Sequence, residues 1–176
     1  ALRRQLAGRQ DLAQRIIGRS PAIQALRELI ANVGDTSANV LILGETGTGK
    51  ELVARCLHDY SRRHQHAFVA LNCGGLPENL FDSEIFGHEA HAFTGANKRR
   101  IGKIEHANGG TLFLDGVGEM SPRLQAKLLR FLQDGCFRRV GSDEEVYLDV
   151  RVICATQVDL SELCAKGEFR QEIGRA

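Results

Sequence analysis

The clearest chemistry in the chain lies in a glycine-rich segment that follows an apolar run. Gly44-Glu45-Thr46-Gly47-Thr48-Gly49-Lys50 fits G-x-x-x-x-G-K, the phosphate-binding P-loop, but Glu51 stands where the pattern has Ser or Thr. Glycines let successive backbone N–H groups surround a phosphate, and the helix that follows adds its positive end. We predict that this segment binds a nucleotide. The alternative is an ordinary glycine turn between a strand and a helix, in a chain with 19 glycines among 176 residues.

A second candidate is Asp115, which ends the apolar run 111–114. An Asp at the end of a buried strand downstream of a P-loop has the position of a Walker B aspartate, which is directed at Mg²⁺. Because position 51 has no hydroxyl, Asp115 and the phosphate oxygens would provide most of the metal ligands. The alternative is an Asp that only caps a turn.

The composition limits the possible classes. A chain of 176 residues that is 43% hydrophobic and 26% charged suits one globular domain, and a net charge of +1 argues against a general nucleic-acid or membrane surface. No apolar run approaches the length of a bilayer span. An odd number of cysteines without a C-x-x-C pair predicts reduced thiols and a cytoplasmic location. The one methionine is Met120, so we expect a piece of a longer protein.

These residues must be positioned by strands that alternate with helices. Four apolar strands are predicted, at 39–43, 67–71, 111–114 and 151–156, and we expect them to be buried on both faces. Ser20-Pro21 and Ser121-Pro122 predict helix starts, and Asp159 or Ser161 could cap a last helix. Residues 136–150 are predicted to form a hairpin. The fold class is therefore α/β with a mostly parallel sheet, over residues 16–176, after a solvated linker at 1–15 from an upstream domain.

Several short strings now combine into a family resemblance. They are Gly44 to Glu51, Leu71-Asn72-Cys73, Ser83 to Glu89, Ala92-Phe93-Thr94-Gly95-Ala96 and Gly109 to Asp115. In this order they resemble the central AAA+ ATPase domain of bacterial enhancer-binding proteins, the activators of sigma-54 RNA polymerase. The resemblance covers about residues 16–170 and includes Glu51. Residues 16–115 look closer to dicarboxylate-transport-type response regulators, and 117–167 to the regulator of aromatic amino-acid genes.

The resemblance implies a three-layer P-loop AAA+ sandwich and a set of roles. Residues 44–51 would hold ATP, with Ile17 and Gly18 near the adenine. Asp115 would handle Mg²⁺ and the hydrolytic water, Asn72 would switch the catalytic glutamate, Thr156 would act as sensor I, and Arg170 would begin the arginine-finger segment. Phe93, Thr94 and Gly95 would contact sigma-54. An exposed Phe93 on a long loop suits such a contact, although a disordered insertion is the alternative reading.

The implied partners are sigma-54 RNA polymerase, other copies of the chain in a homo-oligomeric ring, and DNA through a missing C-terminal domain, with no membrane. We expect the helical lid subdomain to be absent from these residues. The leading function is coupling of ATP binding and hydrolysis to remodelling of sigma-54 RNA polymerase. The alternative is a nucleotide-binding regulatory module with little or no hydrolysis.

That alternative rests on departures from the family pattern. Gly116 replaces the Walker B glutamate, and loss of a general base typically costs 10²–10⁴-fold in rate. Glu119 is expected to face elsewhere, though rescue by it stays open. His91 replaces the first glycine of the GAFTGA loop, where a side chain would restrict the turn. After Arg170 the expected second arginine is displaced to Arg175. His88 and His91 lack the full zinc-protease pattern, so a metal site there is not expected.

Overall fold

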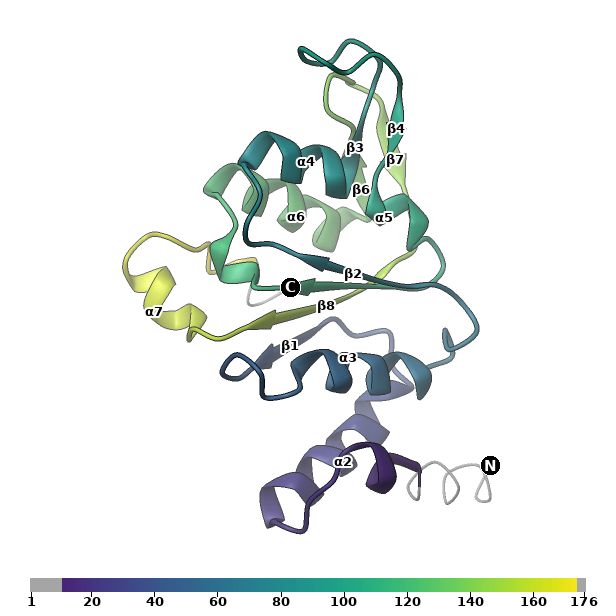
Figure 1. Cartoon of the computed structure of the whole chain (residues 1–176), viewed down its shortest axis with the longest axis vertical. Coiled ribbons are helices and arrows are strands. Elements are labelled where there is room, and N and C mark those ends of the chain that lie inside the picture. Colours follow the sequence, from purple (N-terminus) through teal and green to yellow (C-terminus); the bar gives the residue numbers. More distant parts are fainter. Residues whose placement is uncertain (1–10, 174–176) are drawn as a thin grey trace.

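The computed structural model describes residues 11 to 173, and it places a parallel four-stranded sheet at the centre (Figure 1). The strands are β1 (Val40–Leu43), β2 (Phe68–Asn72), β5 (Thr111–Asp115) and β8 (Arg151–Thr156). They lie in the order β1-β8-β5-β2, and all three pairings are parallel. Each connection therefore crosses over the sheet, as βαβ units require. The predicted α/β fold with a mostly parallel sheet is confirmed.

Helices cover both faces of the sheet and make three layers. One face carries α2 (Pro21–Gly34) and α3 (Lys50–Asp59), and the other carries α4 (Glu78–Phe86), α5 (Lys103–His106) and α6 (Pro122–Asp134) (Figure 1). Alternate residues of the central strand β8 point to the two sides: Val152 and Cys154 belong to the core under α4 and α6, and Ile153 and Ala155 to the core under α2 and α3. This alternation explains why β8 reads as a continuous apolar run.

The prediction that all four strands are buried on both faces is correct for β5 and β8 and wrong for the outer two. β1 lies at one edge of the sheet, where Leu41 and Leu43 remain 48% and 60% exposed. β2 lies at the other edge and is only partly buried. An apolar run by itself does not reveal strand order, and only the central strands have neighbours on both sides.

The chain before α2 also differs from the prediction. Residues 11–15 are helical, and Leu12 and Ile16 are buried against α2 and α3. The predicted solvated linker is therefore wrong for residues 11–15, because two apolar residues four positions apart form one buried helix face within a charged stretch. Residues 1–10 lie outside the described part of the chain.

The predicted helix starts are confirmed. The Ser20 hydroxyl accepts a hydrogen bond from Ile23 N at 3.3 Å, and the Ser121 hydroxyl accepts one from Leu124 N at 3.4 Å. Asp159, rather than Ser161, caps α7 (Leu160–Ala165) by accepting from Ser161 N at 2.9 Å. Side chains that satisfy the first N–H groups of a helix in this way define where the helix begins. Among the described residues, no helix combines the length and apolarity that a bilayer span needs.

Two small antiparallel ribbons stand apart from the sheet, at the top of Figure 1. β3 (Gly87–His88) pairs with β4 (Arg100–Ile101), and β6 (Cys136–Arg138) pairs with β7 (Glu145–Tyr147), as the predicted hairpin requires. The loop 89–99 joins β3 to β4. We call it the β3–β4 loop. A short 3₁₀ turn, η1 (Val117–Glu119), follows β5.

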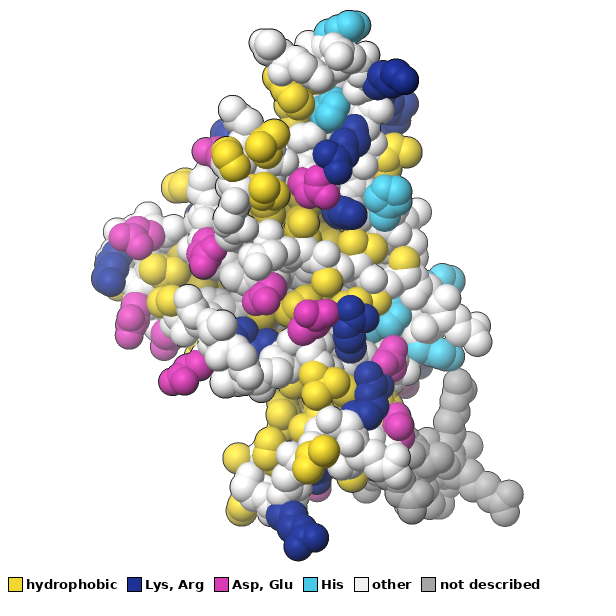
Figure 2. Space-filling view, viewed as in Figure 1, with side chains coloured by type: hydrophobic (Ala, Val, Ile, Leu, Met, Phe, Trp, Pro, Cys, Tyr) yellow, Lys and Arg dark blue, Asp and Glu magenta, His cyan; other side chains and the backbone are white. Residues whose placement is uncertain are grey.

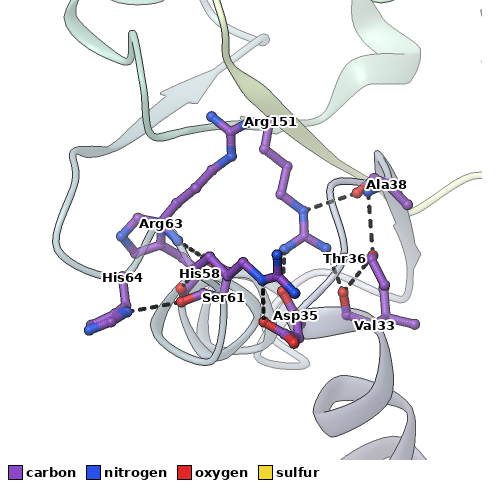
Figure 3. Close-up of polar contacts among 11 residues, drawn as sticks. Val33, Asp35, Thr36, Ala38, His58, Ser61, Arg63, His64 and Arg151 are labelled. Carbon is purple, nitrogen blue, oxygen red and sulfur yellow. Dashed lines mark hydrogen bonds and ion pairs between the residues drawn. The ribbon is translucent and has the colours of Figure 1, made fainter.

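A buried arginine holds the amino end of the sheet together (Figure 3). Arg151 at the start of β8 is 1% exposed and donates to the carbonyl oxygens of Val33, Gly34 and Ala38 at 2.9 to 3.0 Å. These carbonyls belong to the last turn of α2 and the segment after it, where a positive charge is favourable. Burial lowers the pKa of Arg151. The arginine therefore ties α2 to the central strand.

Candidate functional site

The strand register brings the candidate chemical residues to one edge of the sheet. Leu43 of β1, which precedes the P-loop, lies opposite Thr156 of β8. Ala155 in turn lies opposite Asp115, and Asp115 lies opposite Asn72 of β2. The carboxyl ends of the strands point to the side of the molecule that carries α7 (Figure 1). In open α/β sheets this edge is where ligands bind.

The P-loop itself is an open turn with two glycines in the left-handed region. Gly47 and Gly49 have φ values of 80° and 88°, and a Cβ on either would meet no atom within 4 Å. Both positions therefore require glycine because of their backbone conformation, and the space where a side chain would stand is free. The loop is closed by hydrogen bonds from Thr48 N and Oγ1 to Glu45 O, and Thr46 Oγ1 donates to Gln157 Oε1 at 2.6 Å.

Among residues 11–173, no carboxylate forms an ion pair with Lys50 of this loop. Lys50 Nζ donates to the carbonyl oxygens of Gly44 and Glu45 at 2.7 and 2.6 Å. Gly49 is the N-cap of α3 and provides no side-chain acceptor, so the first N–H groups of the helix are not capped. Glu51 forms an ion pair with Arg55 at 2.9 Å, one turn further along α3. A helix start without a side-chain cap, next to a lysine ammonium held only by backbone carbonyls, is suited to a phosphate.

The three strand-end residues differ in how they are held. The Thr156 hydroxyl is buried and donates to Val158 O at 3.0 Å. Asn72 Oδ1 accepts from Gly74 N at 2.9 Å, which leaves its amide N–H groups as donors. Within residues 11–173, no side-chain hydrogen bond or ion pair engages the Asp115 carboxylate, which is partly exposed. Asp115 is thus an acidic group at this edge that is available to a cation.

The expectation that Glu119 faces away is wrong. A Cβ built on Gly116 would lie 3.8 Å from Glu119 Cδ and 3.9 Å from Glu119 Oε2. Gly116 has φ 78° and ψ 38°, and Glu119 N donates to Gly116 O at 3.0 Å. This left-handed start and tight turn bring the side chain back over position 116, because residues i and i+3 of a 3₁₀ turn eclipse one another. An extended chain after β5 would not give that placement.

The segment predicted to lie near an adenine precedes α2. Ile17 is 83% exposed, and Gly18 has a positive φ of 150°. The guanidinium of Arg27 donates to Ile16 O at 2.5 and 2.8 Å and to Gly18 O at 2.7 Å. The partly buried Arg27 thus holds the backbone of the segment in place while the Ile17 side chain stays open to solvent.

The β3–β4 loop presents the residues predicted to contact sigma-54. Phe93 is 37% exposed, Thr94 is exposed, and Gly95 has φ 97° with no atom near a would-be Cβ. The Phe93 ring meets the ring of His88 edge-on, with centroids 4.9 Å apart. Lys, Arg and His side chains gather over this upper part of the face shown in Figure 2.

His88 anchors the loop and is not a zinc ligand candidate. Its Nε2 donates to Lys98 O at 3.0 Å, which makes Nδ1 the acceptor for the Ser83 hydroxyl at 2.5 Å. Both ring nitrogens are thereby occupied, and no cluster of three metal-ligating side chains occurs between residues 11 and 173. The spacing of the histidines did not predict this anchoring role, for which the signal is the position of His88 at the end of the short strand β3.

His91 has the backbone conformation that its sequence position suggested. It is the one described non-glycine residue with positive φ, at 63°. This conformation costs an L-residue about 1–2 kcal/mol. His91 N donates to Ala96 O at 2.6 Å and closes the loop. The loop therefore keeps the turn of a glycine although the residue has a side chain.

The β6–β7 hairpin is attached to this loop. Glu89 N donates to Val140 O and Val140 N donates to Gly87 O, each at 3.0 Å, and a Cβ on Gly141 would contact Ala92. Arg139 of this hairpin is buried and forms a bidentate pair with Glu105 at 2.8 and 3.0 Å. A neighbouring acidic residue on α5, distant in sequence, neutralises it.

Arg170 lies beside the carboxyl edge on an exposed segment. Its backbone N–H donates to Gln125 Oε1 at 3.0 Å, and the preceding Phe169 is buried in the core under α6. Gln125 is itself buried, and its amide donates to Met120 O and Glu168 O at 2.9 Å. The sequence signal for this contact is Gln125, a polar residue on the apolar face of α6, and it was not used in the prediction. Arg175 lies outside the described residues.

Comparisons with known proteins agree with this geometry. A family model described as "Sigma-54 interaction domain" matches residues 16–174. The chain is 54% identical over 172 residues to the C4-dicarboxylate transport transcriptional regulatory protein DctD of Pseudomonas aeruginosa, covering 98% of the chain and 37% of that protein. It is 48% identical over 172 residues to the Nif-specific regulatory protein of Azotobacter vinelandii, covering 98% and 33%. The chain spans about a third of the length of these curated relatives.

Solved structures give the same result. NtrX from Brucella abortus in complex with ADP is similar with a TM-score of 0.84 and 36% identity, over 99% of this chain and 36% of that one. Its complex with ATP has a TM-score of 0.82 and 37% identity, over 90% and 34%. A P-loop NTPase domain of a sigma-54 transport activator from E. coli shares the fold, at 24% identity and a TM-score of 0.60, over 90% and 91%. The chain therefore belongs to the sigma-54 interaction domain family, a family of AAA+ ATPases.

Proposed function

We propose that this chain binds Mg-ATP at the P-loop and uses its binding and hydrolysis to move the β3–β4 loop against sigma-54 RNA polymerase. The observation that supports it most directly is the short structural connection between the two sites. β2 ends at Asn72 beside Asp115, and α4 leads from there to β3 and the loop that carries Phe93. Whole-protein properties, namely a homo-oligomeric ring and DNA binding through another domain, belong to the same proposal.

The residues present fit a nucleotide. The open space over Gly47 and Gly49, the uncapped start of α3 and the Lys50 ammonium together form a cradle for phosphates. For Mg²⁺, Asp115 is the protein ligand, and phosphate oxygens and water would complete the shell, as is usual for this ion. In this reading Mg²⁺ neutralises the charge that develops on the phosphates.

The roles of the other site residues follow from their places. Thr156 joins the P-loop through the hydrogen bond from Gly44 N to Thr156 O at 3.1 Å, which suits a sensor of loop position. Asn72 neighbours Asp115 in register. Arg170, exposed on a segment pinned by Gln125, would serve the nucleotide of a neighbouring copy. Ile17 and Gly18 would lie against the base, and residues 45, 46, 48 and 51 would complete the loop.

Motion at the nucleotide would reach the loop through hydrogen bonds. Cys73 N donates to Asp115 O at 2.8 Å, so the connection from β2 to α4 is tied to the Walker B strand. At the far end of α4, Ser83 binds the ring of His88, and that ring contacts Phe93. A shift of α4 would therefore carry Phe93, Thr94 and Gly95 with it. Exposed aromatic groups of this kind are common at contact points.

The test is binding of sigma-54 by the chain loaded with Mg-ADP and aluminium fluoride, measured by gel filtration or native gels. Phe93→Ala should abolish the complex. Tyr147→Ala, which removes an aromatic side chain that is 67% exposed on the neighbouring β7, should leave it intact. The proposal fails if Phe93→Ala binds as well as the unmodified chain, or if both variants lose binding equally.

A second candidate function follows from one specific observation. Gly116 has no side chain to accept a proton, at the position where the family pattern has the Walker B glutamate. In this reading the chain binds ATP and responds to it but turns it over slowly or not at all. Under saturating Mg-ATP it would then show tight binding with no phosphate release above the level of a Lys50→Ala control.

A further inference from the structure

The side chain that Gly116 lacks would point toward the carboxylate of Glu119. A Cβ on Gly116 would have as its three nearest atoms Glu119 Cδ at 3.8 Å, Glu119 Oε2 at 3.9 Å and Asn72 Oδ1 at 4.0 Å. All of these are ordinary van der Waals distances and none is backbone. The volume that a longer side chain at position 116 would enter is thus bordered by the Glu119 carboxylate and the Asn72 amide oxygen.

The backbone directs Glu119 to this place. Gly116 adopts a left-handed conformation that disfavours other residues, and η1 then turns the chain so that position 119 stands over position 116. The carboxylate also leans over Gly74, where any Cβ would collide with Glu119 Oε2. Gly116 and Gly74 thus both leave room for the same side chain. The lack of a side chain at position 116 and the placement of Glu119 therefore have the same structural cause, the left-handed turn at Gly116.

The Glu119 carboxylate has free acceptor positions. Within residues 11–173, no Lys, Arg or His nitrogen forms an ion pair with Glu119, and no side-chain hydrogen bond holds it. The Asn72 amide beside it has its oxygen engaged by Gly74 N, so its N–H groups are the ones left to hold a carboxylate or a water. Asp115, the proposed Mg²⁺ ligand, lies opposite Asn72 in the sheet.

We infer that Glu119 is the general base of this chain, serving the attacking water in place of a side chain at position 116. This inference rests on the proposed ATPase function. The water oxygen forms a bond to the γ-phosphorus while the bond from that phosphorus to the β–γ bridging oxygen breaks. ADP leaves with that electron pair, and the proton of the water goes to a Glu119 carboxylate oxygen and then to solvent. Asn72 positions the carboxylate.

The test compares Glu119→Gln with the unmodified chain. Gln keeps the size and the hydrogen-bonding shape but cannot accept the proton, so kcat should fall about 100-fold or more. The Kd for ATP, measured without turnover, should stay within about threefold, and binding of ADP with aluminium fluoride should weaken. Glu162→Gln, an exposed glutamate at the start of α7, is the matched control and should change none of these. Gly116→Glu added to Glu119→Gln should restore part of the rate.

The outcomes separate the two proposals. Unchanged kcat in Glu119→Gln, with clear turnover in the unmodified chain, overturns the role of Glu119 and leaves the ATPase function standing. Tight ATP binding without turnover, together with hydrolysis in Gly116→Glu, also overturns it and favours the regulatory module. An unmodified chain that binds ATP no better than Lys50→Ala removes the basis of both.

Discussion

The two ends of the parallel sheet are built on opposite principles. At the amino end, Arg151 donates to three carbonyl oxygens (Figure 3). His58 is held there by Thr111 and His66, and Arg63 pairs with Asp149 at 2.6 Å. At the carboxyl end, Lys50 is held only by carbonyls of its own loop, and the described residues place no counter-charge on Glu119 or Asp115. Both ends contain charged groups next to backbone turns.

The difference separates stability from function. A buried polar group contributes to stability only when its hydrogen bonds are satisfied, which is the state of the amino end. A binding site needs donors and acceptors that a ligand can still reach, which is the state of the carboxyl end. Substitutions at the amino end should therefore change the free energy of unfolding, and substitutions at the carboxyl end should change affinity or rate.

The largest expected effect is that of Arg151→Met. It leaves three carbonyl groups at the end of α2 without donors, and the free energy of unfolding should fall by about 3–5 kcal/mol. Urea unfolding measures this. Arg151→Lys keeps the charge but lacks the planar fork of the guanidinium, so its free energy of unfolding should lie between those of Arg151→Met and the unmodified chain. Arg62→Met is the matched control: this arginine is 84% exposed and pairs with Asp35 at 3.3 Å, so its loss should cost less than about 0.5 kcal/mol. A change below 1 kcal/mol in Arg151→Met would contradict the structural role.

The next effect should appear in binding instead. Lys50→Ala removes a charged donor from the P-loop, and the affinity for ATP should fall about 10- to 100-fold, as expected for loss of a charge-assisted hydrogen bond worth about 1.5–3 kcal/mol. The carbonyls that it leaves lie in an exposed loop, so water can replace the ammonium and the unfolding midpoint should hardly change. Lys166→Ala, an exposed lysine after α7, should affect neither. A large loss of stability in Lys50→Ala would break the comparison between the two ends.

The smallest effect is a pH dependence at the amino end. His58 is buried between Thr111 Oγ1 at 2.9 Å and His66 O at 3.1 Å, and burial lowers its pKa from the ordinary value of 6.5. As the pH falls, the imidazole is therefore protonated in the unfolded chain before it is protonated in the folded one. The free energy of unfolding should be highest above pH 6.5 and should decrease as the pH falls toward the folded pKa of His58, by less than about 1.4 kcal/mol per pH unit. His58→Gln should flatten this slope in urea titrations between pH 7 and 5. His106→Gln, at an exposed histidine, should not, and equal slopes in His58→Gln and the unmodified chain would refute the assignment.

Much of the fold was predictable because it depends on local signals. The serine caps, the prolines that follow them and the continuous apolar runs identify elements by chemistry that acts within a few residues, as Ser20 and Ser121 illustrate. The P-loop was predictable for the same reason, since its glycines and Lys50 act within one turn. The exposure of Phe93 followed from its place among small residues on a long loop.

Other features depend on which segments meet, and sequence reasoning missed them. Leu12 is buried only because α2 and α3 provide a surface for it. Arg139 reads as a surface charge until Glu105 is placed beside it. Gln125 connects Met120 with Glu168 and Arg170, which are far apart in the chain. Each contact joins residues whose spacing carries no periodic signal.

The sequence by itself determined the family, the strand–helix alternation and the P-loop pattern, since these rest on residue types at fixed short spacings. Only the tertiary structure decided which strands are edges, because pairing partners come from distant segments. It alone decided that Arg151 is buried and that Glu119 stands over Gly116. That last placement needs a left-handed glycine, a 3₁₀ turn and a glycine on the neighbouring strand connection to act together, and no single stretch of sequence contains all three.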